Sequence, residues 1–246
     1  MRLYCPDLPG TGALVPGEIS VQGEEFEYAK ILRARPGDTV FLFDGKGREA
    51  RGVIADIARK RLLVRTEEVF SNFQKEPALD VALLPGILKG QKMDFVIQKA
   101  VELGVCRISP LITGRTQIGE TRKLDRWRKI SIEAARQCGR SVVPPVDEPV
   151  VFSRYFFLEK NSVGERRGVI FWEGGGAGLK ELSGRLRDAR RLEVAVGPEG
   201  GFSAEEVSLA KEKGFHVAGL GPRILRAETA AVLAVGLVQF LFGDLG

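Results

Sequence analysis

Apolar and polar residues alternate over short stretches in the first seventy residues, which is the pattern of a half-buried β-sheet. A turn signal, Asp44-Gly45-Lys46-Gly47, separates two of these stretches and is typical of a β-hairpin. One helix is expected among the strands, ending before Pro36-Gly37, because these two residues stop helices. Short strands around one helix predict a small β-barrel. We expect the strands at 38–43, 52–55 and 62–65, and the helix at 24–35.

From residue 79 onward the pattern changes to apolar runs of strand length that alternate with helical periodicity. This alternation predicts an α/β fold class with a mostly parallel sheet covered by helices on both faces. Ser203 and Glu206 form an S-x-x-E capping box at the start of one helix. We expect strands at 79–84, 105–112, 168–172, 192–196 and 215–218, and helices at 91–103, 124–138, 179–187, 204–213 and about 227–242. The polar, patternless stretch near 70–77 divides the chain into two domains, 1–72 and 73–246.

Composition narrows the class of protein. The 246 residues are 44% hydrophobic, which is ample for a buried core. The longest apolar stretch, 230–242, is too short for a membrane span of roughly 20 residues, and the N-terminus lacks the layout of a signal peptide. Three cysteines without C-x-x-C spacing indicate neither a disulfide framework nor a zinc site. We therefore expect a cytoplasmic protein.

The net charge of +5 is spread unevenly. Residues 86–141 contain twelve Lys and Arg against five Asp and Glu, whereas residues 1–75 are close to balanced. A basic face could bind a polyanion by neutralising its phosphates. The alternative is an ordinary solvated helix surface.

Two glycine-containing loops lie in the last fifty residues, and each follows an expected strand and precedes an expected helix. Loops in this position lie at the carboxyl ends of strands, where open α/β sheets bind ligands, and so we expect both to line one pocket. In the first loop, 197–203, Gly200 and Gly201 allow close approach of the backbone to a ligand. Glu199 in the same loop disfavours a phosphate and favours hydroxyls, an amine or a sulfonium; a plain turn with an exposed glutamate is the alternative.

The second loop, 220–226, places the apolar Ile224 and Leu225 where a plain surface loop would be polar. These two residues could form the walls of an adenine slot. Arg226 at the start of a helix is unfavourable to the helix dipole, which favours a functional reason for it. Glu228 could serve the dipole alone.

Other motifs point to no site. The run Glu173-Gly174-Gly175-Gly176-Ala177-Gly178 follows a strand but does not complete G-x-G-x-x-G, and the chain has no P-loop motif. His216, the one histidine, is expected to be structural, so a zinc site or a catalytic triad is disfavoured. Cys138 could be an activated thiol beside Arg136 and Arg140, although a buried cysteine is the simpler interpretation.

The loop sequences resemble those of the RsmE family, SPOUT-class methyltransferases that methylate N3 of a uridine in 16S ribosomal RNA. The similarity extends over nearly the whole chain. The segments that carry it are Gly197–Gly201, Leu220–Arg226, Glu228–Ala230, Ile97–Val105, Glu133–Arg140, Ile31–Arg33, Gly37–Asp38, Phe43–Gly45 and Phe242–Gly246. Two positions depart from the family pattern: Glu27 replaces a common histidine, and Arg136 replaces a common acidic residue.

The resemblance implies a PUA-like β-barrel at 1–72 that binds RNA, followed by a SPOUT methyltransferase domain at 73–246 with a deep trefoil knot. It also implies S-adenosylmethionine as the cofactor, no metal, and a homodimer whose interface completes each active site. The partner would be 16S rRNA of the small ribosomal subunit, which places the protein in ribosome biogenesis. The cofactor-binding residues implied are Phe171, Trp172, Glu173, Val196, Gly197, Pro198, Glu199, Gly200, Gly201, Leu220, Gly221, Ile224, Leu225, Arg226, Thr229 and Ala230.

For catalysis we expect Arg226 to stabilise negative charge on the uracil carbonyls, and Glu228 to be a candidate proton acceptor. Arginine and lysine side chains suit phosphate contacts, and we expect these from Arg33, Lys89, Lys92, Arg115 and Arg140. Two alternatives remain: a SPOUT methyltransferase acting on tRNA or on a ribose 2′-hydroxyl, and a non-catalytic RNA-binding assembly factor.

Overall fold

The computed structural model of the chain describes residues 1–8, 17–117, 123–158 and 167–246, which form two compact units. The N-terminal unit comprises Met1–Glu76 together with Ala135–Val143, and the C-terminal unit comprises Pro77–Ala134 with Pro144–Gly246. The chain therefore returns to the N-terminal unit for nine residues before it completes the C-terminal one. The expected order of strands and helices does not predict this return.

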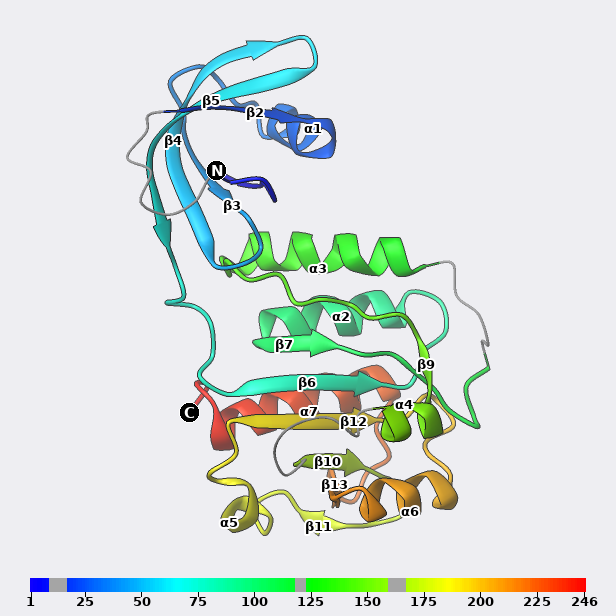
Figure 1. Ribbon diagram of the computed structural model, residues 1–246. Helices are drawn as coiled ribbons and strands as arrows, with labels where there is room; N and C mark the ends of the chain where they lie inside the picture. The colour runs from blue at the N-terminus through cyan, green and yellow to red at the C-terminus, as the bar shows by residue number, and fades with distance from the viewer. Residues whose placement is uncertain (9–16, 118–122, 159–166) are drawn as a thin grey trace. The chain divides into compact units, whose positions relative to one another are not determined.

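The N-terminal unit contains a five-stranded sheet and one helix (Figure 1). Its elements are β1 (Arg2–Tyr4), β2 (Glu18–Gln22), α1 (Gly23–Ile31), β3 (Thr39–Phe43), β4 (Arg48–Ala58) and β5 (Arg61–Ser71). The strand order is β1-β3-β4-β5-β2, antiparallel except for the parallel pair β1–β3. The expected hairpin joins β3 and β4, and the buried Asp44 shapes its turn by accepting hydrogen bonds from the N–H groups of Lys46 (2.7 Å) and Arg48 (3.0 Å).

One hydrophobic core fills this unit, and all five strands and α1 contribute to it. Leu3 comes from β1, Val21 from β2 and Phe26 from α1, beside inward-facing residues of the three longer strands. A sheet that encloses one core in this way agrees with the expected small barrel.

The C-terminal unit is built on a six-stranded sheet in the order β11-β13-β10-β12-β6-β7, in which every pair is parallel. The parallel α/β sheet predicted from the alternating pattern is therefore confirmed. Its strands are β6 (Asp80–Pro85), β7 (Val105–Ile108), β10 (Gly168–Phe171), β11 (Ala177–Gly178), β12 (Arg191–Val196) and β13 (Phe215–Gly219). A separate parallel pair consists of β8 (Leu111–Ile112) and β9 (Val150–Val151).

Helices cover both faces of the six-stranded sheet (Figure 1). The helices of this unit are α2 (Lys92–Glu102), α4 (Phe152–Leu158), α5 (Ser183–Leu186), α6 (Ala204–Glu212) and α7 (Ala227–Phe242). A further helix, α3 (Leu124–Cys138), begins in this unit, and its residues from Ala135 onward belong to the N-terminal unit. Helix α7 packs on β6 and β12 and also against α2. On the other face, α4 and α6 share a hydrophobic cluster with Leu84, Ile170 and Ala195. Ser203 caps α6 in a complete capping box with Glu206, as predicted.

Three of the expected elements differ from the structure. Helix α1 ends at Ile31 instead of residue 35, because Arg33 adopts a left-handed conformation with φ of 57°. The strand expected at 105–112 divides into β7 and β8 around Pro110, whose nitrogen has no hydrogen to donate to a ladder. The helix expected at 179–187 contains only the four residues of α5, whose interior includes Gly184, a poor helix former.

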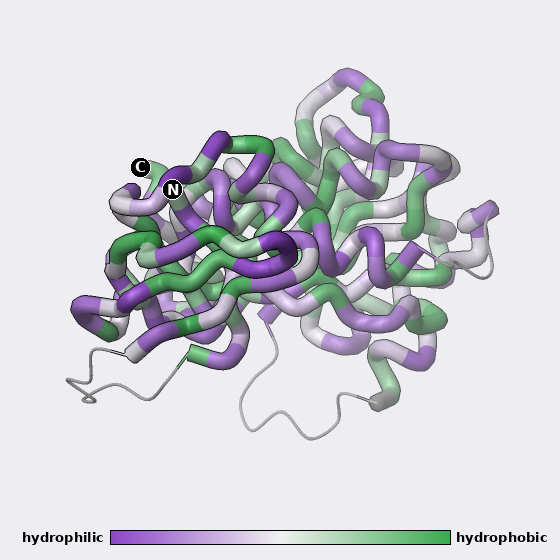
Figure 2. Tube along the Cα trace, turned by 90° about the horizontal axis from the view of Figure 1, so that it is seen from above, coloured by the Kyte–Doolittle hydropathy of each residue, from purple (hydrophilic) through white to green (hydrophobic). Residues whose placement is uncertain are grey.

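Apolar stretches are short and are separated by polar segments along the described trace (Figure 2). In the described part of the chain, no helix has the length and apolar character needed to cross a membrane. The trefoil knot implied by the family resemblance stays a prediction.

Candidate active site

The candidate site lies at the carboxyl ends of three neighbouring strands. Strand β10 pairs in parallel with β12 on one side and with β13 on the other. Phe171, the last residue of β10, is in register with Val196 and Ala218, so the three strands end at nearly the same level. The loops that follow them therefore meet at one edge of the sheet, which is where open α/β sheets bind ligands.

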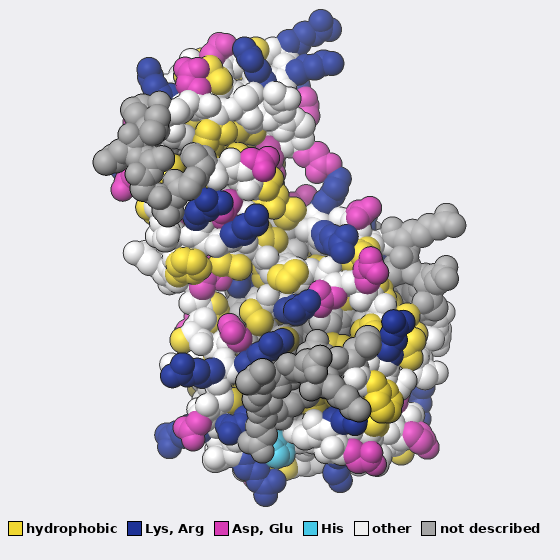
Figure 3. Space-filling view, viewed as in Figure 1, with side chains coloured by type: hydrophobic (Ala, Val, Ile, Leu, Met, Phe, Trp, Pro, Cys, Tyr) yellow, Lys and Arg dark blue, Asp and Glu magenta, His cyan; other side chains and the backbone are white. Residues whose placement is uncertain are grey.

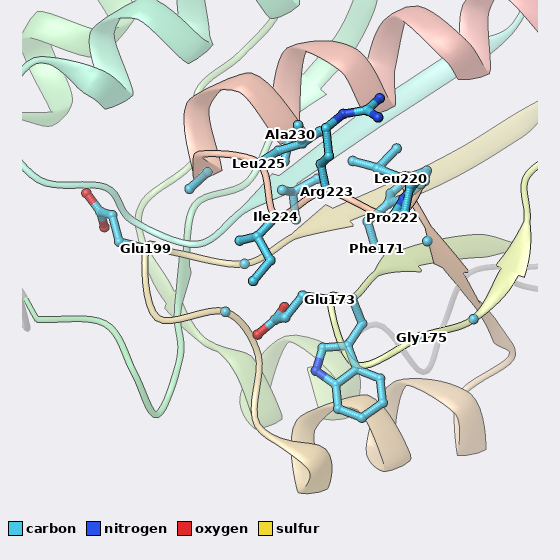
Figure 4. Close-up of a pocket in the computed structure, with 18 of the residues that line it drawn as sticks. Phe171, Glu173, Gly175, Glu199, Leu220, Pro222, Arg223, Ile224, Leu225 and Ala230 are labelled. Carbon is cyan, nitrogen blue, oxygen red and sulfur yellow. The ribbon is translucent and has the colours of Figure 1, made fainter.

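A pocket of about 560 Å³ opens at this edge (Figure 4). Both glycine loops line it, as their positions after β12 and β13 predict, and the segment after β10 contributes a third side. Its size lies within the range of about 300–1,000 Å³ that small-molecule sites occupy. The lining residues are Phe171, Trp172, Glu173, Gly175, Gly176, Ala177, Gly178, Val196, Gly197, Pro198, Glu199, Gly200, Gly201, Gly219, Leu220, Gly221, Pro222, Arg223, Ile224, Leu225, Ala227 and Ala230.

Most residues expected at a cofactor site line this pocket, and two do not: Arg226 and Thr229. Sequence reasoning missed Gly175–Gly178, together with Gly219, Pro222, Arg223 and Ala227. The signal for the first group was present, because the glycine run at 174–178 follows β10. The run does not match the dinucleotide-binding motif, but such a mismatch does not exclude another ligand.

The 197–203 loop is compact because glycines occupy its tightest points. Gly201 has a φ of 69°, which favours glycine, and its N–H donates to the carbonyl oxygen of Pro198 at 2.8 Å. A β-carbon at Gly197 would lie 2.9–3.0 Å from the backbone of Gly201 and Phe202. Backbone atoms, not side chains, therefore form much of this side of the pocket.

Glu199 belongs to the same loop, but its carboxylate points away from Ile224 and the middle of the pocket (Figure 4). Its Oε1 accepts hydrogen bonds from the backbone N–H of Lys89 and from Nζ of Lys92, each at 3.1 Å. Burial raises the pKa of Glu199, but these hydrogen bonds and the one from its own backbone outweigh burial and hold the pKa below its ordinary value. The carboxylate thus anchors the loop, and the contact with a ligand expected from the sequence stays a prediction.

Glu173 supplies a carboxylate that does point into the pocket, below Ile224 (Figure 4). Its Oε1 lies 4.0 Å from Nη1 of Arg115, and the same Nη1 donates to the carbonyl oxygen of Gly200 at 2.7 Å. Arg115 therefore joins the segment after β10 to the 197–203 loop. Because the Glu173 side chain is partly exposed, its charge is accessible to a ligand.

The 220–226 loop forms the opposite wall. Ile224 is 89% exposed and hangs over the pocket near Glu173 (Figure 4). Such an apolar side chain in open solvent at a pocket mouth is what a bound ring system would cover. Arg226 is the N-cap residue of α7 and is exposed, and within the described chain its guanidinium has no hydrogen-bond or ion-pair partner.

Glu228, the proposed proton acceptor, lies in the first turn of α7 and does not line the pocket. Its Oε2 is buried and is 3.9 Å from Nζ of Lys92. Within the described residues, this oxygen has no hydrogen-bond partner. The geometry places Glu228 beside Lys92 instead of beside a reacting group in the pocket.

The expected RNA contacts fall into different surroundings. Arg33 and Lys89 are exposed, whereas Lys92 and Arg115 contact carboxylates at the pocket. Arg140 is a correction: its side chain is only 5% exposed and donates two hydrogen bonds to Glu76, at 2.7 and 2.9 Å. A buried guanidinium that is already paired is not accessible to a phosphate.

Most of the lysine and arginine side chains in residues 86–141 lie close to carboxylates. Many of these cations lie within 4.0 Å of carboxylates, several from distant parts of the sequence, and basic and acidic side chains are interspersed on the face shown in Figure 3. The expected continuous basic face is therefore not seen there. The paired cations are Lys92, Lys99, Arg107, Arg115, Arg126, Arg128, Arg136 and Arg140.

His216 and Cys138 lie outside the pocket. His216 is in β13, and burial lowers its pKa, with a smaller contribution from the charge of Arg185. In the described chain, no group of three or more His, Cys, Asp or Glu side chains could hold a metal ion.

Comparisons with known proteins agree with this architecture. Residues 74–239 match the family model of an RNA methyltransferase domain, and residues 21–67 match that of an RNA methyltransferase PUA domain. Ribosomal RNA small subunit methyltransferase E of Buchnera aphidicola is 33% identical over 221 residues, 87% of this chain and 84% of its own. The Synechocystis protein of the same name is 34% identical over 86% of this chain and 69% of its own.

Solved structures give the same result. Ribosomal RNA small subunit methyltransferase E from Neisseria gonorrhoeae, crystallised with S-adenosylmethionine, has a TM-score of 0.89 at 31% identity and covers 100% of this chain and 99% of its own. A putative methyltransferase from Legionella pneumophila, also with bound S-adenosylmethionine, has a TM-score of 0.88 at 32% identity, covering 99% and 98%. The PUA-like N-terminal domain and the α/β methyltransferase fold inferred from the sequence are thereby confirmed. The chain belongs to the ribosomal RNA small subunit methyltransferase E family.

Proposed function

We propose that this protein is an S-adenosylmethionine-dependent methyltransferase that methylates N3 of one uridine in 16S rRNA. The observation that carries the proposal is that both glycine loops line one pocket at the ends of β10, β12 and β13. Two proteins with the same fold were crystallised with S-adenosylmethionine. The pocket offers the apolar side chains of Ile224 and Leu225, backbone groups of the glycine loops and the inward carboxylate of Glu173.

These features fit the cofactor. Ile224 and Leu225 offer apolar cover for a purine ring, and the glycine loops offer backbone hydrogen-bonding groups at close range. The carboxylate of Glu173 offers a negative charge for the cationic part of the cofactor. When bound, the cofactor supplies an electrophilic methyl group on a positively charged sulfur.

The protein would contribute positioning and charge stabilisation. Uracil N3 carries a proton, and negative charge develops on the uracil carbonyls as the proton leaves. We place Arg226 beside this charge, because it is exposed, unpaired within the described chain and flanked by the pocket residues Leu225 and Ala227. The position of Glu228 beside Lys92 does not favour it as the proton acceptor.

RNA binding is assigned to both parts of the chain. We propose that residues 1–72 form an RNA-binding domain, with Arg33 as one phosphate contact, and that residues 73–246 form the methyltransferase domain, with Lys89 and Arg115 as further contacts. Arg140 is not among the proposed contacts, because it is buried against Glu76.

A homodimer is part of the proposal. Leu233 and Phe240 on α7 are 38% and 57% exposed and lie seven residues apart, so they share one face of the helix. Phe95 on α2, which packs against α7, is also exposed. Exposed apolar side chains of this size favour a protein partner, and a second copy of the chain agrees with the family resemblance. We further propose a cytoplasmic enzyme that needs no metal.

Titration of the purified protein with S-adenosylmethionine tests the proposal against an assembly factor. We expect saturable binding that S-adenosylhomocysteine competes for. An RNA-binding scaffold that keeps only the fold would bind RNA and neither compound.

A further inference from the structure

Lys92 lies between two carboxylates that come from different elements of the C-terminal unit. Its Nζ is 3.1 Å from Oε1 of Glu199 and 3.9 Å from Oε2 of Glu228. Glu199 belongs to the 197–203 loop, and Glu228 belongs to the first turn of α7, directly after the 220–226 loop. We call these three residues the Lys92 cluster.

The cluster rests on a rigid base. Lys92 is the first residue of α2, which packs along α7, and both helices have buried apolar residues, among them Val96 and Val235. The backbone N–H of Lys89, three residues before Lys92, donates to the same Glu199 oxygen. Lys92 at the start of α2 and Lys89 just before it thus both donate to Glu199 of the 197–203 loop.

Lys92 is the one positive charge of the cluster, and it interacts with both carboxylates. Glu199 stays ionised because its hydrogen bonds hold its pKa below the ordinary value. Glu228 Oε2 is buried, and within the described residues it has no hydrogen bond, so the nearby ammonium is its main compensation. Without Lys92, two carboxylates near the same point would repel each other, and the loop would lose its side-chain anchor.

We propose that Lys92 is a positioning residue that fixes the 197–203 loop against the start of α7, and thereby preforms the cofactor pocket. The expected effect on cofactor affinity rests on the proposed function. The anchoring of the 197–203 loop by Lys92 does not depend on it. It replaces the phosphate contact expected from the sequence. A phosphate would have to displace both carboxylates from the Lys92 ammonium.

Hydrogen exchange of the cofactor-free protein tests the anchor. Lys92→Met removes the charge, and Lys99→Met is the matched control, because Lys99 lies on the same helix with similar exposure and pairs with Glu102 at 2.7 Å, outside the pocket. We expect faster exchange of the amides at 197–203, including Gly201, in Lys92→Met only, with α6 unchanged. Equal exchange in both variants would overturn the proposal, whether or not the protein binds S-adenosylmethionine.

A double-mutant cycle tests the consequence for the cofactor. Lys92→Met and Glu199→Gln should each weaken S-adenosylmethionine binding, about two- to fivefold for partly exposed ion pairs. The double variant should be no weaker than the worse single variant, because both changes remove the same interaction. Lys92→Arg should restore part of the affinity. Additive losses, or no restoration by arginine, would contradict the assignment.

RNA affinity separates positioning from phosphate binding. If Lys92 positions the loop, Lys92→Met and Lys99→Met lower affinity for a 16S rRNA fragment equally. The loss of activity in Lys92→Met then lies mainly in KM for S-adenosylmethionine and less in kcat. A specific loss of RNA affinity in Lys92→Met, with a salt dependence reduced by about one phosphate contact, would identify Lys92 as an RNA contact and overturn the proposal.

Discussion

The carboxylate of Glu173 occupies the space that a β-carbon at Gly201 would need. One residue follows β10 and the other lies in the loop after β12, and the two strands are neighbours in the sheet. Gly201 also has a positive φ of 69°. Glycine is therefore needed at position 201 both for the turn and for the space that the inward carboxylate occupies.

Gly201→Ala should disturb the pocket more than the fold. The left-handed backbone and the contact with Glu173 together cost about 1–2 kcal/mol, which corresponds to roughly a tenfold loss of S-adenosylmethionine affinity if the loop moves to relieve them. Calorimetric titration measures this loss. Gly184→Ala is the control, because a β-carbon there meets nothing within 4 Å and φ is not positive. Equal affinities of the two variants would show that the loop does not need this geometry.

Glu173→Gln should weaken S-adenosylmethionine binding by about fivefold, because it removes a charge that is partly exposed and faces the pocket. S-adenosylhomocysteine lacks the sulfonium charge but keeps the ammonium group. A loss restricted to S-adenosylmethionine would place the sulfonium beside Glu173, and an equal loss for both compounds would place the ammonium there. Unchanged binding of both would contradict a role of Glu173 in recognising the cationic part.

Arg226→Ala should lower kcat about a hundredfold, the usual loss when one group that stabilises developing charge is removed. Cofactor affinity should change less than twofold, because Arg226 does not line the pocket. Arg223→Ala serves as the control, since Arg223 is an exposed arginine of the same loop but lines the pocket. Methylation by Arg226→Ala at the wild-type rate, with cofactor binding intact, would exclude the catalytic role.

The double variant Leu233→Glu/Phe240→Glu should convert a dimer into a monomer, because two buried carboxylates would lose their hydration at the interface. Sedimentation velocity measures the mass of both proteins. Phe157→Glu is the control, since Phe157 is 55% exposed on α4 instead of α7. A wild-type monomer, or a double variant that stays dimeric, would remove this face of α7 from consideration.

Strands and helices were predicted best where neighbouring residues alone determine an apolar run or a helix cap. The strands that became β10, β12 and β13 are short apolar runs, and α3 has the predicted ends. Local patterns did not reveal that Arg33 adopts φ of 57° and ends α1 early. They also missed β1, β2, β9, β11 and α4, which are seven residues or shorter and depend on pairing or packing with distant parts of the chain.

The candidate site follows the same rule. The positions of the two loops after strands were readable, and most of the expected residues line the pocket. The contacts of these residues could not be predicted from the sequence, because ion pairs such as Lys92–Glu199 join positions 107 residues apart. Lys92 and Arg140 resemble surface cations in the sequence, and only their partners show that one is paired with Glu199 and the other is buried beside Glu76.

The central claim is methylation of uridine N3 in 16S rRNA, and the most direct measurement is transfer of labelled methyl groups from S-adenosylmethionine to small ribosomal subunits, free 16S rRNA and tRNA. The modified nucleoside is then identified by mass spectrometry and mapped. We predict N3-methyluridine at one position of 16S rRNA and no transfer to tRNA. A ribose-methylated product, transfer to tRNA, or no transfer by a protein that still binds RNA tightly would contradict the proposed function.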